Sequence, residues 1–419
     1  MMHEERRLPV WLAGVLMFAV VGLLAWRVLA VNVAEYFARE PGREAAALQW
    51  QSQHPRALFL QGMASAKAGA ATETTLEQMR EALRANPASG RSYVVLGRLQ
   101  EAAGNLPAAQ AAMESAALMS PRRTDVQMEV ASFWMRRGDV ARALQHWDIA
   151  LAFNGEVRKT LFPGLLQLAE NPATQPAFAP LLKKQLAWWP AFFAFAADQA
   201  KQVETVHALF ALQQKGPNTI TEAALRTFVG RLQREGLWTD AYFVWLNNLP
   251  GDQVNSVGNL FNGGFEYPLS NLGFDWIANK VPQVQVETAA TFGSTGSRAL
   301  HVSFQGSKLK YRHLYQHLLL PAGRYTLRGR VRPESLETSQ GLQWAISCQG
   351  DAQAQALGTS ERFLGSDQWR YFSTQFEVPE ENCAAQTLRL ELVGRAALDL
   401  EARGGIWFDD LVIERQKLD

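Results

Sequence analysis

Cysteine is scarce in this 419-residue chain, and neither sign of charge dominates it. Lysine and arginine number 41 against 40 aspartate and glutamate residues, so the formal net charge is +1. This balance excludes the bulk electrostatic attraction by which basic proteins bind nucleic acid, and we expect no nucleic-acid partner. The chain is 47% hydrophobic and contains 13 Trp and 22 Phe, which excludes disorder as its dominant state.

The only two cysteines are Cys348 and Cys383, both near the C-terminal end. They are too few for a disulfide-rich framework, and two interpretations of the pair are open. In the first interpretation, they are two separate buried thiols. If this segment lies outside the cytoplasm, they are instead joined by a disulfide.

Recognisable catalytic motifs are missing as well. The chain has no paired carboxylates in a hydrolase motif, no nucleophile elbow, and no glycine-rich phosphate loop followed by a helix and a lysine. His146 and His207 are isolated in the sequence. We therefore expect that the protein is not an enzyme. An accessory polysaccharide-modifying enzyme with an unrecognised site is the alternative.

Long apolar runs are absent except at the N-terminus. Residues 9–26 carry no charge, and the apolar run resumes after Arg27. At about 1.5 Å per helical residue, this stretch reaches the thickness of a hydrocarbon core. The sequence predicts a short cytoplasmic tail over 1–7 and a transmembrane anchor over 8–31, with the bulk of the chain outside. A signal peptide cleaved near Ala30 is the alternative.

The middle of the chain repeats with the period of a helical array. Pro87 and Pro121 are 34 residues apart. Between them, Leu96-Gly97 and then Ala109 follow the order of small and apolar residues in a 34-residue helical repeat. A five-residue step from Gly to Ala recurs three times, at Gly104–Ala109, Gly138–Ala143 and Gly236–Ala241. Small residues at such positions let paired helices approach closely.

This pattern resembles the tetratricopeptide repeat (TPR) family over roughly 45–154, and a last unit at 221–249 keeps the register. The resemblance implies an all-α TPR-like solenoid, which we place at 40–250. It also implies a concave surface that binds partner proteins, here proteins of the cell envelope.

Helical periodicity fades after Pro250. Glycines and about eight short alternating runs follow, which is typical of a β-sandwich. The segments NLFNGGFE, GSRALHVSF, YQHLLLPAGRYTLRGRVRP, WRYFSTQFEVP and IWFDDLVIE occur in that order. Together they resemble the jelly-roll carbohydrate-binding modules attached to bacterial glycoside hydrolases. The resemblance covers about 255–415, and we place the domain at 251–419.

In that family a structural calcium ion often ties the first and last strands together. Mapped onto this chain, the resemblance implies Glu266, in GGFE, and Asp409, in FDD, as carboxylate ligands of Ca²⁺. Asp409 shares its parity with Trp407 and Leu411, so it points inward and needs a partner. The alternative is that Asp409 bonds backbone amides and that no metal binds.

The stretch YRHLYQHLLLPAGRY alternates as a strand does. Four aromatic or imidazole side chains share one parity, namely Tyr311, His313, Tyr315 and His317. His313 and His317 then lie about 13 Å apart and cannot share a metal. In the family that this domain resembles, one sheet face forms the sugar cleft, where aromatic rings stack on pyranose rings. The row is therefore a candidate sugar platform, which Trp276 and Trp369 would extend. The alternative is cross-strand pairing on a solvent-exposed face.

These observations combine into one prediction of a multidomain protein. We expect an N-terminal transmembrane helix, an all-α TPR-like solenoid and a C-terminal all-β jelly-roll sandwich. From the domain resemblances we expect a single-pass protein of the bacterial inner membrane, with its bulk in the periplasm. There it would act as a scaffold in exopolysaccharide or envelope polysaccharide assembly or export. A purely structural envelope protein that binds no sugar is the alternative.

Overall fold

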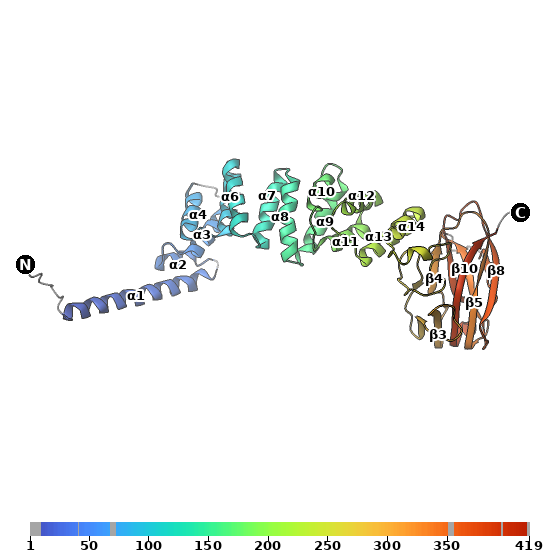
Figure 1. Ribbon diagram of the computed structural model, residues 1–419. Coiled ribbons are helices and arrows are strands. Elements are labelled where there is room, and N and C mark those ends of the chain that lie inside the picture. Colours follow the sequence, from blue (N-terminus) through green and yellow to red (C-terminus); the bar gives the residue numbers. More distant parts are fainter. Residues whose placement is uncertain (1–9, 41, 68–72, 351–355, 395–396, 417–419) are drawn as a thin grey trace, which may run out of the picture. The chain divides into compact units, whose positions relative to one another are not determined.

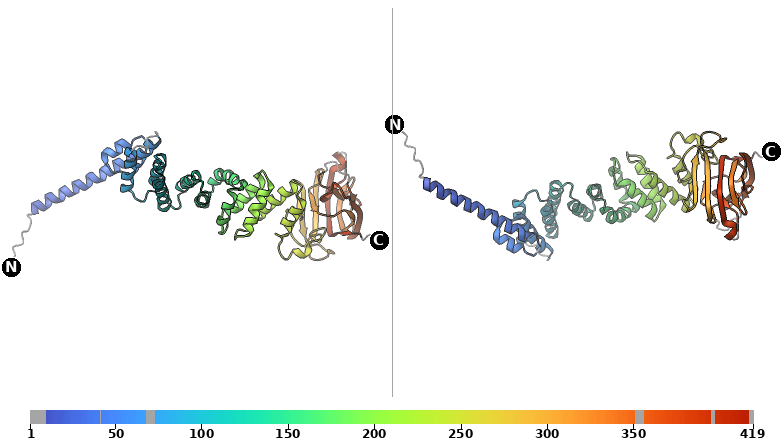
Figure 2. Two further views of the ribbon diagram at one scale, coloured as in Figure 1. Left: turned by 90° about the horizontal axis from the view of Figure 1, so that it is seen from above. Right: turned by 90° about the horizontal axis from the view of Figure 1, so that it is seen from below.

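The chain divides into two compact units in a computed structural model that describes residues 10–40, 42–67, 73–350, 356–394 and 397–416. The first unit comprises residues 1–189 and 211–218, and the second comprises 190–210 and 219–419 (Figure 1, Figure 2). The predicted cytoplasmic tail over 1–7 lies outside the described residues.

The described residues form fourteen α-helices before the strands begin. They are α1 (Val10–Ala38), α2 (Glu44–Trp50), α3 (Pro55–Lys67), α4 (Glu73–Ala85), α5 (Gly90–Ala102), α6 (Leu106–Met119), α7 (Thr124–Arg136), α8 (Val140–Phe153), α9 (Val157–Glu170), α10 (Phe178–Leu181), α11 (Trp189–Gln199), α12 (Val203–Gln214), α13 (Glu222–Arg234) and α14 (Trp238–Leu246).

The N-terminal helix α1 contains the predicted membrane segment from Val10 onward, and residues 8 and 9 lie outside the described residues. Of the helices described, it is the one that is long and apolar enough to cross a membrane, through Gly14–Ala38 with a mean hydropathy of 2.2. Its 25 residues rise about 37 Å as a helix, which exceeds a hydrocarbon core of about 30 Å. A single-pass anchor and a signal sequence both have this form.

The repeat predicted in the middle of the chain folds as pairs of helices. Helix α5 packs on α6, and α7 packs on α8. Gly104 (φ 77°) and Gly138 (φ 74°) follow the first helix of each pair in the left-handed conformation that glycine adopts without strain. The next residues, Asn105 and Asp139, cap the second helices through their side chains. The Gly-to-Ala step thus marks where one helix ends and the next begins.

Successive pairs are tied together at the spacing of the repeat. Arg91 donates from Nε to the Asp125 carboxylate at 2.6 Å, one period of 34 residues away. Arg136 donates to Glu101 at 2.7 Å. Since these ion pairs are exposed, each contributes about 1 kcal/mol or less. The stacking therefore rests mainly on buried apolar side chains such as Met113 and Trp134.

The C-terminal part is an antiparallel β-sandwich of two five-stranded sheets (Figure 1). The first sheet has the order β1-β4-β9-β6-β7 and the second the order β2-β3-β10-β5-β8. The strands are β1 (Ile277–Ala278), β2 (Val284–Ala289), β3 (Ala299–Lys308), β4 (Leu314–Leu318), β5 (Gly323–Thr338), β6 (Leu342–Cys348), β7 (Gly358–Thr359), β8 (Arg370–Val378), β9 (Gln386–Leu392) and β10 (Glu401–Arg415).

The core of the sandwich lies between the two sheets and is rich in aromatic rings. Trp344 of β6 packs against Phe408 of β10 at 5.1 Å between ring centroids, so the two sheets meet there. Cys348 and Cys383 form a disulfide that ties the end of β6 to the segment before β9. These two strands are also paired directly, with Cys348 opposite Gln386.

The last two helices, α13 and α14, belong to the same unit as the sandwich. Trp245 of α14 is buried, with Phe261 and Phe274 at ring centroid distances of 5.1 and 5.7 Å. Gln233 of α13 donates to the carbonyl of Gly273 at 3.1 Å. The predicted division at residue 250 follows the change from helical periodicity to short alternating runs. The second compact unit extends across this position, because it includes α13 and α14.

At Gly273 the backbone packs closely against α14. Its φ is +64°, and a β-carbon there would lie 2.5 Å from Cδ1 of Trp245. We predict that Gly273→Ala lowers the free energy of unfolding of this unit by about 2–4 kcal/mol, from backbone strain and overpacking together. Gly236→Ala is the matched control, because φ is +76° there but no atom lies within 4 Å of the added carbon. Thermal denaturation followed by tryptophan fluorescence compares the two, and equal losses would contradict a tight joint at Gly273.

Candidate functional site

The outward face of the sheet that contains β4, β9 and β6 carries the candidate site. Tyr315 lies opposite Arg389, and Gln343 lies opposite Glu391, so polar side chains of three adjacent strands form rows across this face. The guanidinium of Arg389 lies 5.6 Å from the centre of the Tyr315 ring. The alternate positions of β4, including Leu314 and Leu318, are buried in the core. The outward face therefore carries polar side chains on all three strands.

One end of this face is covered by α14. The Trp238 ring lies 5.3 Å from the imidazole of His317, and Gln349 and Thr387 are each 3.4 Å from its Nδ1. Burial, and secondarily the charge of Arg389, lower the pKa of His317 to about 4. This end is therefore largely an internal contact of the second unit.

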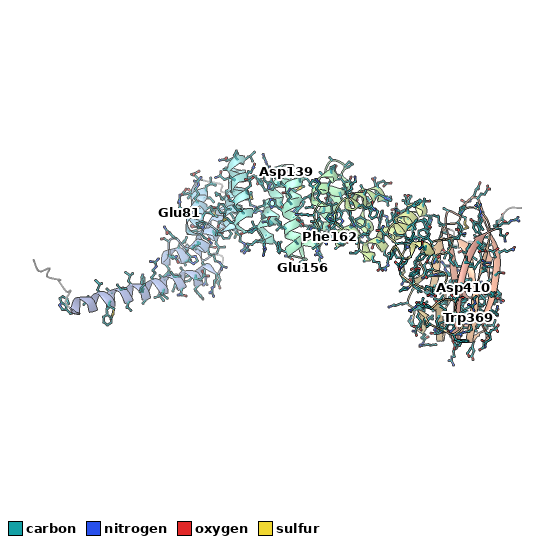
Figure 3. All side chains as sticks on the ribbon, in the orientation of Figure 1. Glu81, Asp139, Glu156, Phe162, Trp369 and Asp410 are labelled. Carbon is teal, nitrogen blue, oxygen red and sulfur yellow. A yellow bond between two sulfur atoms is a disulfide. The ribbon has the colours of Figure 1, made fainter. Side chains whose placement is uncertain are left out.

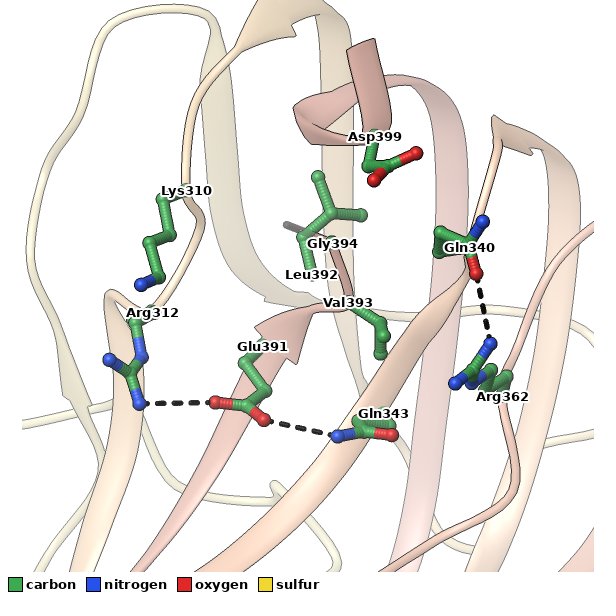
Figure 4. A pocket seen from close by; sticks show the side chains of 10 residues that line it. All are labelled: Lys310, Arg312, Gln340, Gln343, Arg362, Glu391, Leu392, Val393, Gly394 and Asp399. Carbon is green, nitrogen blue, oxygen red and sulfur yellow. Dashed lines mark hydrogen bonds and ion pairs between the residues drawn. The ribbon is translucent and has the colours of Figure 1, made fainter. Parts of the chain in front are cut away.

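The other end of the face opens into a groove of about 690 Å³. Its charged and amide side chains are Lys310, Arg312, Gln340, Gln343, Arg362, Glu391 and Asp399. Glu391 is the centre of a short network, because Arg312 lies 3.4 Å from its carboxylate and Gln343 donates to it at 3.0 Å (Figure 4). Arg362 donates to the Gln340 oxygen at 3.0 Å. Mutual hydrogen bonds thus hold these side chains in place.

The predicted Tyr/His row is only partly present on this face. Tyr315 and His317 lie on it as expected. Tyr311 does not, and its placement on this face was wrong: it is buried in the core, its ring 5.1 Å from that of Phe304, and burial raises its pKa. The reason is that β4 begins at Leu314, so the alternation does not extend back to Tyr311. His313 is half-buried, next to Tyr311 at 5.6 Å.

The two tryptophans that were expected to extend the platform lie elsewhere. Trp276 is fully buried between Phe265 and Trp344, so the expectation that it contacts a ligand was wrong. Its Nε1 donates to the carbonyl of Asn262 at 3.1 Å. Trp369 precedes β8, at the edge of the other sheet, where its Nε1 donates to the carbonyl of Phe292. It is therefore not part of the groove.

Sequence reasoning missed the groove residues and the neighbouring Arg389 on the same face. Arg389 and Glu391 have the outward parity in TLRLEL, and Gln343 has it in LQWAIS. The alternation in each segment shows which side chains point outward. It does not show that these side chains lie together, because that depends on β4, β9 and β6 being neighbours in the sheet. Arg362 lies outside the long strands, in a segment that bridges to Leu342 through Phe363. No local pattern marks it.

The carboxylates mapped to a calcium site have other partners. Both oxygens of Asp409 accept backbone N–H groups, from Thr295 at 2.7 Å and from Asp410 at 2.8 Å. Glu266 accepts from the amides of Ser297 and Arg298 at 2.9 and 3.1 Å. Burial raises the pKa of Asp409 to about 6. Burial also opposes the charged form of Glu266, but the hydrogen bonds outweigh it and lower its pKa.

Positive charge near Asp409 comes from the side chain of Arg330. It donates to Oγ1 of Thr295 and to the carbonyl of Gly293, both at 2.8 Å, and lies 3.7 Å from the Asp410 carboxylate. Arg330 also lies over the Trp369 ring, in the region labelled in Figure 3.

Hydrogen-bond donors surround the carboxylates of Glu266 and Asp409. Calcium takes about six to eight oxygen ligands, whereas N–H and O–H donors face the carboxylates of Glu266 and Asp409. The described residues contain no group of three or more His, Cys, Asp or Glu side chains that could hold a metal ion. The geometry agrees with the alternative in which Asp409 bonds backbone amides, and calcium binding stays a prediction.

Several solved carbohydrate-binding modules are similar to this chain. A CBM4 module is 14% identical and matches 37% of this chain and 98% of its own, with a TM-score of 0.28. The CBM22-1 xylan-binding domain of Xyn10C from Paenibacillus barcinonensis is 15% identical over 34% of this chain and 87% of its own, with a TM-score of 0.25. Family 16 Carbohydrate Binding Module-2 is 15% identical over 38% of this chain and 100% of its own, with a TM-score of 0.28. No protein-family model and no curated protein matches the chain.

The burial of His317 predicts a pH dependence. Because its pKa in the folded chain is about 4, below the ordinary 6.5, the fold favours the neutral imidazole, and stability is lost as the pH falls from 6.5 towards 4. We predict that His317→Gln removes about 1–2 kcal/mol of this acid-induced loss. Thermal unfolding between pH 7 and pH 4 measures it. Burial also lowers the pKa of His313, so His313→Gln is the comparison and should remove a smaller part of the loss. Equal acid sensitivity of wild type and His317→Gln would contradict this assignment.

Proposed function

We propose that the protein is a membrane-anchored, extracytoplasmic scaffold whose sandwich binds glycan through the face of β4, β9 and β6. The single observation that carries the proposal is the open groove on this face. Its amide and charged side chains are held by one another, and the half-buried Tyr315 lies on the same sheet face outside the groove lining. Sugars are recognised by such fixed donors and acceptors next to an aromatic ring.

The groove suits a chain-like polar ligand better than a small apolar one. Gln343 supplies both an amide donor and an acceptor, Glu391 supplies acceptors, and Arg312 supplies donors. Sugar hydroxyls donate and accept hydrogen bonds, so they can pair with all three side chains. Apolar side chains in the lining are limited to Leu392 and Val393. Resemblance to carbohydrate-binding modules is in keeping with this ligand class.

The helical unit would supply protein contacts, for which we propose envelope proteins as partners. Leu118 near the end of α6 is 73% exposed, and Phe153 at the end of α8 is 56% exposed. Corresponding ends of two successive helix pairs thus present apolar side chains, which is the kind of surface that partner proteins cover. With α1 as the anchor, the chain would serve bacterial polysaccharide assembly or export without being an enzyme itself. The alternative is a structural envelope protein that binds no sugar.

A glycan array probed with the full chain in detergent tests this proposal. We predict binding to at least one polysaccharide, and a loss of about tenfold in affinity for both Tyr315→Ala and Gln343→Ala, since each removes about 1–2 kcal/mol of contact. Tyr371→Ala is the control, because this tyrosine is 78% exposed on a strand of the other sheet. Absence of binding by the wild type, or an equal loss in Tyr371→Ala, would contradict the proposal.

A further inference from the structure

The groove carries more positive than negative charge, and the two signs are not equally paired. Its cations are Lys310, Arg312 and Arg362, and its carboxylates are Glu391 and Asp399. Arg312 is paired with Glu391. Within the described part of the chain, no carboxylate lies within ion-pair distance of Lys310 or Arg362. Arg362 instead donates a hydrogen bond to the neutral side chain of Gln340. Two cations therefore remain available to a ligand.

Among the residues described, the other sheet has both paired and unpaired arginines, and Arg332 and Arg403 have no ion pair there. The whole chain has a formal net charge of only +1, and on the other sheet the arginines of β5 are largely paired, as Arg324 is with Glu377 and Arg328 with Glu414. Lys310 and Arg312 lie on one side of the groove and Arg362 on the other (Figure 4). A ligand lying along the groove would thus meet free positive charge on both of its sides.

Besides Lys310 and Arg362, a third cation that has no ion pair among the described residues, Arg389, lies on the same sheet face outside the groove. Arg389 lies beside Glu391 on β9, and its Nε is buried without a hydrogen-bond partner. Among the residues described, no carboxylate forms an ion pair with it, and burial lowers its pKa. An unpartnered buried N–H donor costs free energy. The Arg389 side chain as a whole is partly exposed, so its charge can still attract an anion on this face.

We propose that the face of β4, β9 and β6 binds an anionic polysaccharide that carries carboxylate groups, such as a chain of uronic acids. The carboxylates would lie against Lys310 and Arg362, with a further one near Arg389, and the sugar hydroxyls against Gln343 and Glu391. Guanidinium groups favour carboxylates because both are planar and can form paired hydrogen bonds. This inference rests on the proposed glycan binding and specifies the class of glycan.

The test compares two oligosaccharides that differ only in charge. The full chain, in detergent micelles, is titrated with a hexauronate and with the same hexasaccharide after reduction of its carboxyl groups to hydroxymethyl groups. We expect the hexauronate to bind at least about tenfold more tightly, which corresponds to about 1.4 kcal/mol. The preference should shrink as salt is raised, because exposed charges are screened.

Paired variants locate the charge. Lys310→Gln combined with Arg362→Gln should lower the affinity for the hexauronate more than the affinity for the reduced form, so that most of the preference is lost and only the part due to Arg389 remains. Arg324→Gln combined with Arg328→Gln removes the same formal charge from the other sheet and should keep the preference.

Each of the other outcomes overturns the inference. Equal binding of the two oligosaccharides would overturn the anionic specificity while leaving glycan binding intact. An equal loss of preference in the Arg324 and Arg328 variant would mean that attraction is non-specific, and would also overturn it. If the chain binds neither oligosaccharide but binds another member of the glycan array, this inference alone is overturned. If it binds neither oligosaccharide and no member of the array, both this inference and the proposed function are overturned.

Discussion

The contact between α14 and the sandwich determines which part of the sheet face remains open. Trp245 packs against Phe261 and Phe274, and Gly273 admits this ring only because it has no side chain. Once α14 is held there, Trp238 lies on His317 and closes one end of the face. Burial of apolar and aromatic area drives this contact, and the polar residues at the other end keep their exposure to solvent. The groove is thus what the helix leaves uncovered.

The last helix pair, α13 and α14, and the sandwich pack together within the second unit. The last helix pair carries the Gly-to-Ala step of the repeat at Gly236–Ala241, yet it packs within the unit of the sandwich. In the proposed function, the same helix pair both ends the repeat and borders the glycan surface. The free cations, Lys310 and Arg362, lie at the open end of the face, and their charge gives that end its proposed preference for carboxylates.

Much of the fold could be predicted because it depends on local patterns. Glycine and cap residues at Gly104-Asn105 and Gly138-Asp139 mark the helix ends, and the alternation in LYQHL marks β4. The site could be predicted only in part. Tyr311 was misplaced because parity holds only within a strand, and β4 begins three residues later. The groove joins residues from segments far apart in the chain, and their proximity depends on strand order, which local periodicity does not contain.

Hydrogen–deuterium exchange of the full chain, with and without hexauronate, tests most directly whether the open end of this face is the binding site. We predict slower exchange on ligand addition at residues 310–314, 340–343 and 389–393, and no change in α14 or β8. Protection confined to β5 and β8 on the other sheet, or release of α14 from the sandwich, would contradict a ligand site in the uncovered groove.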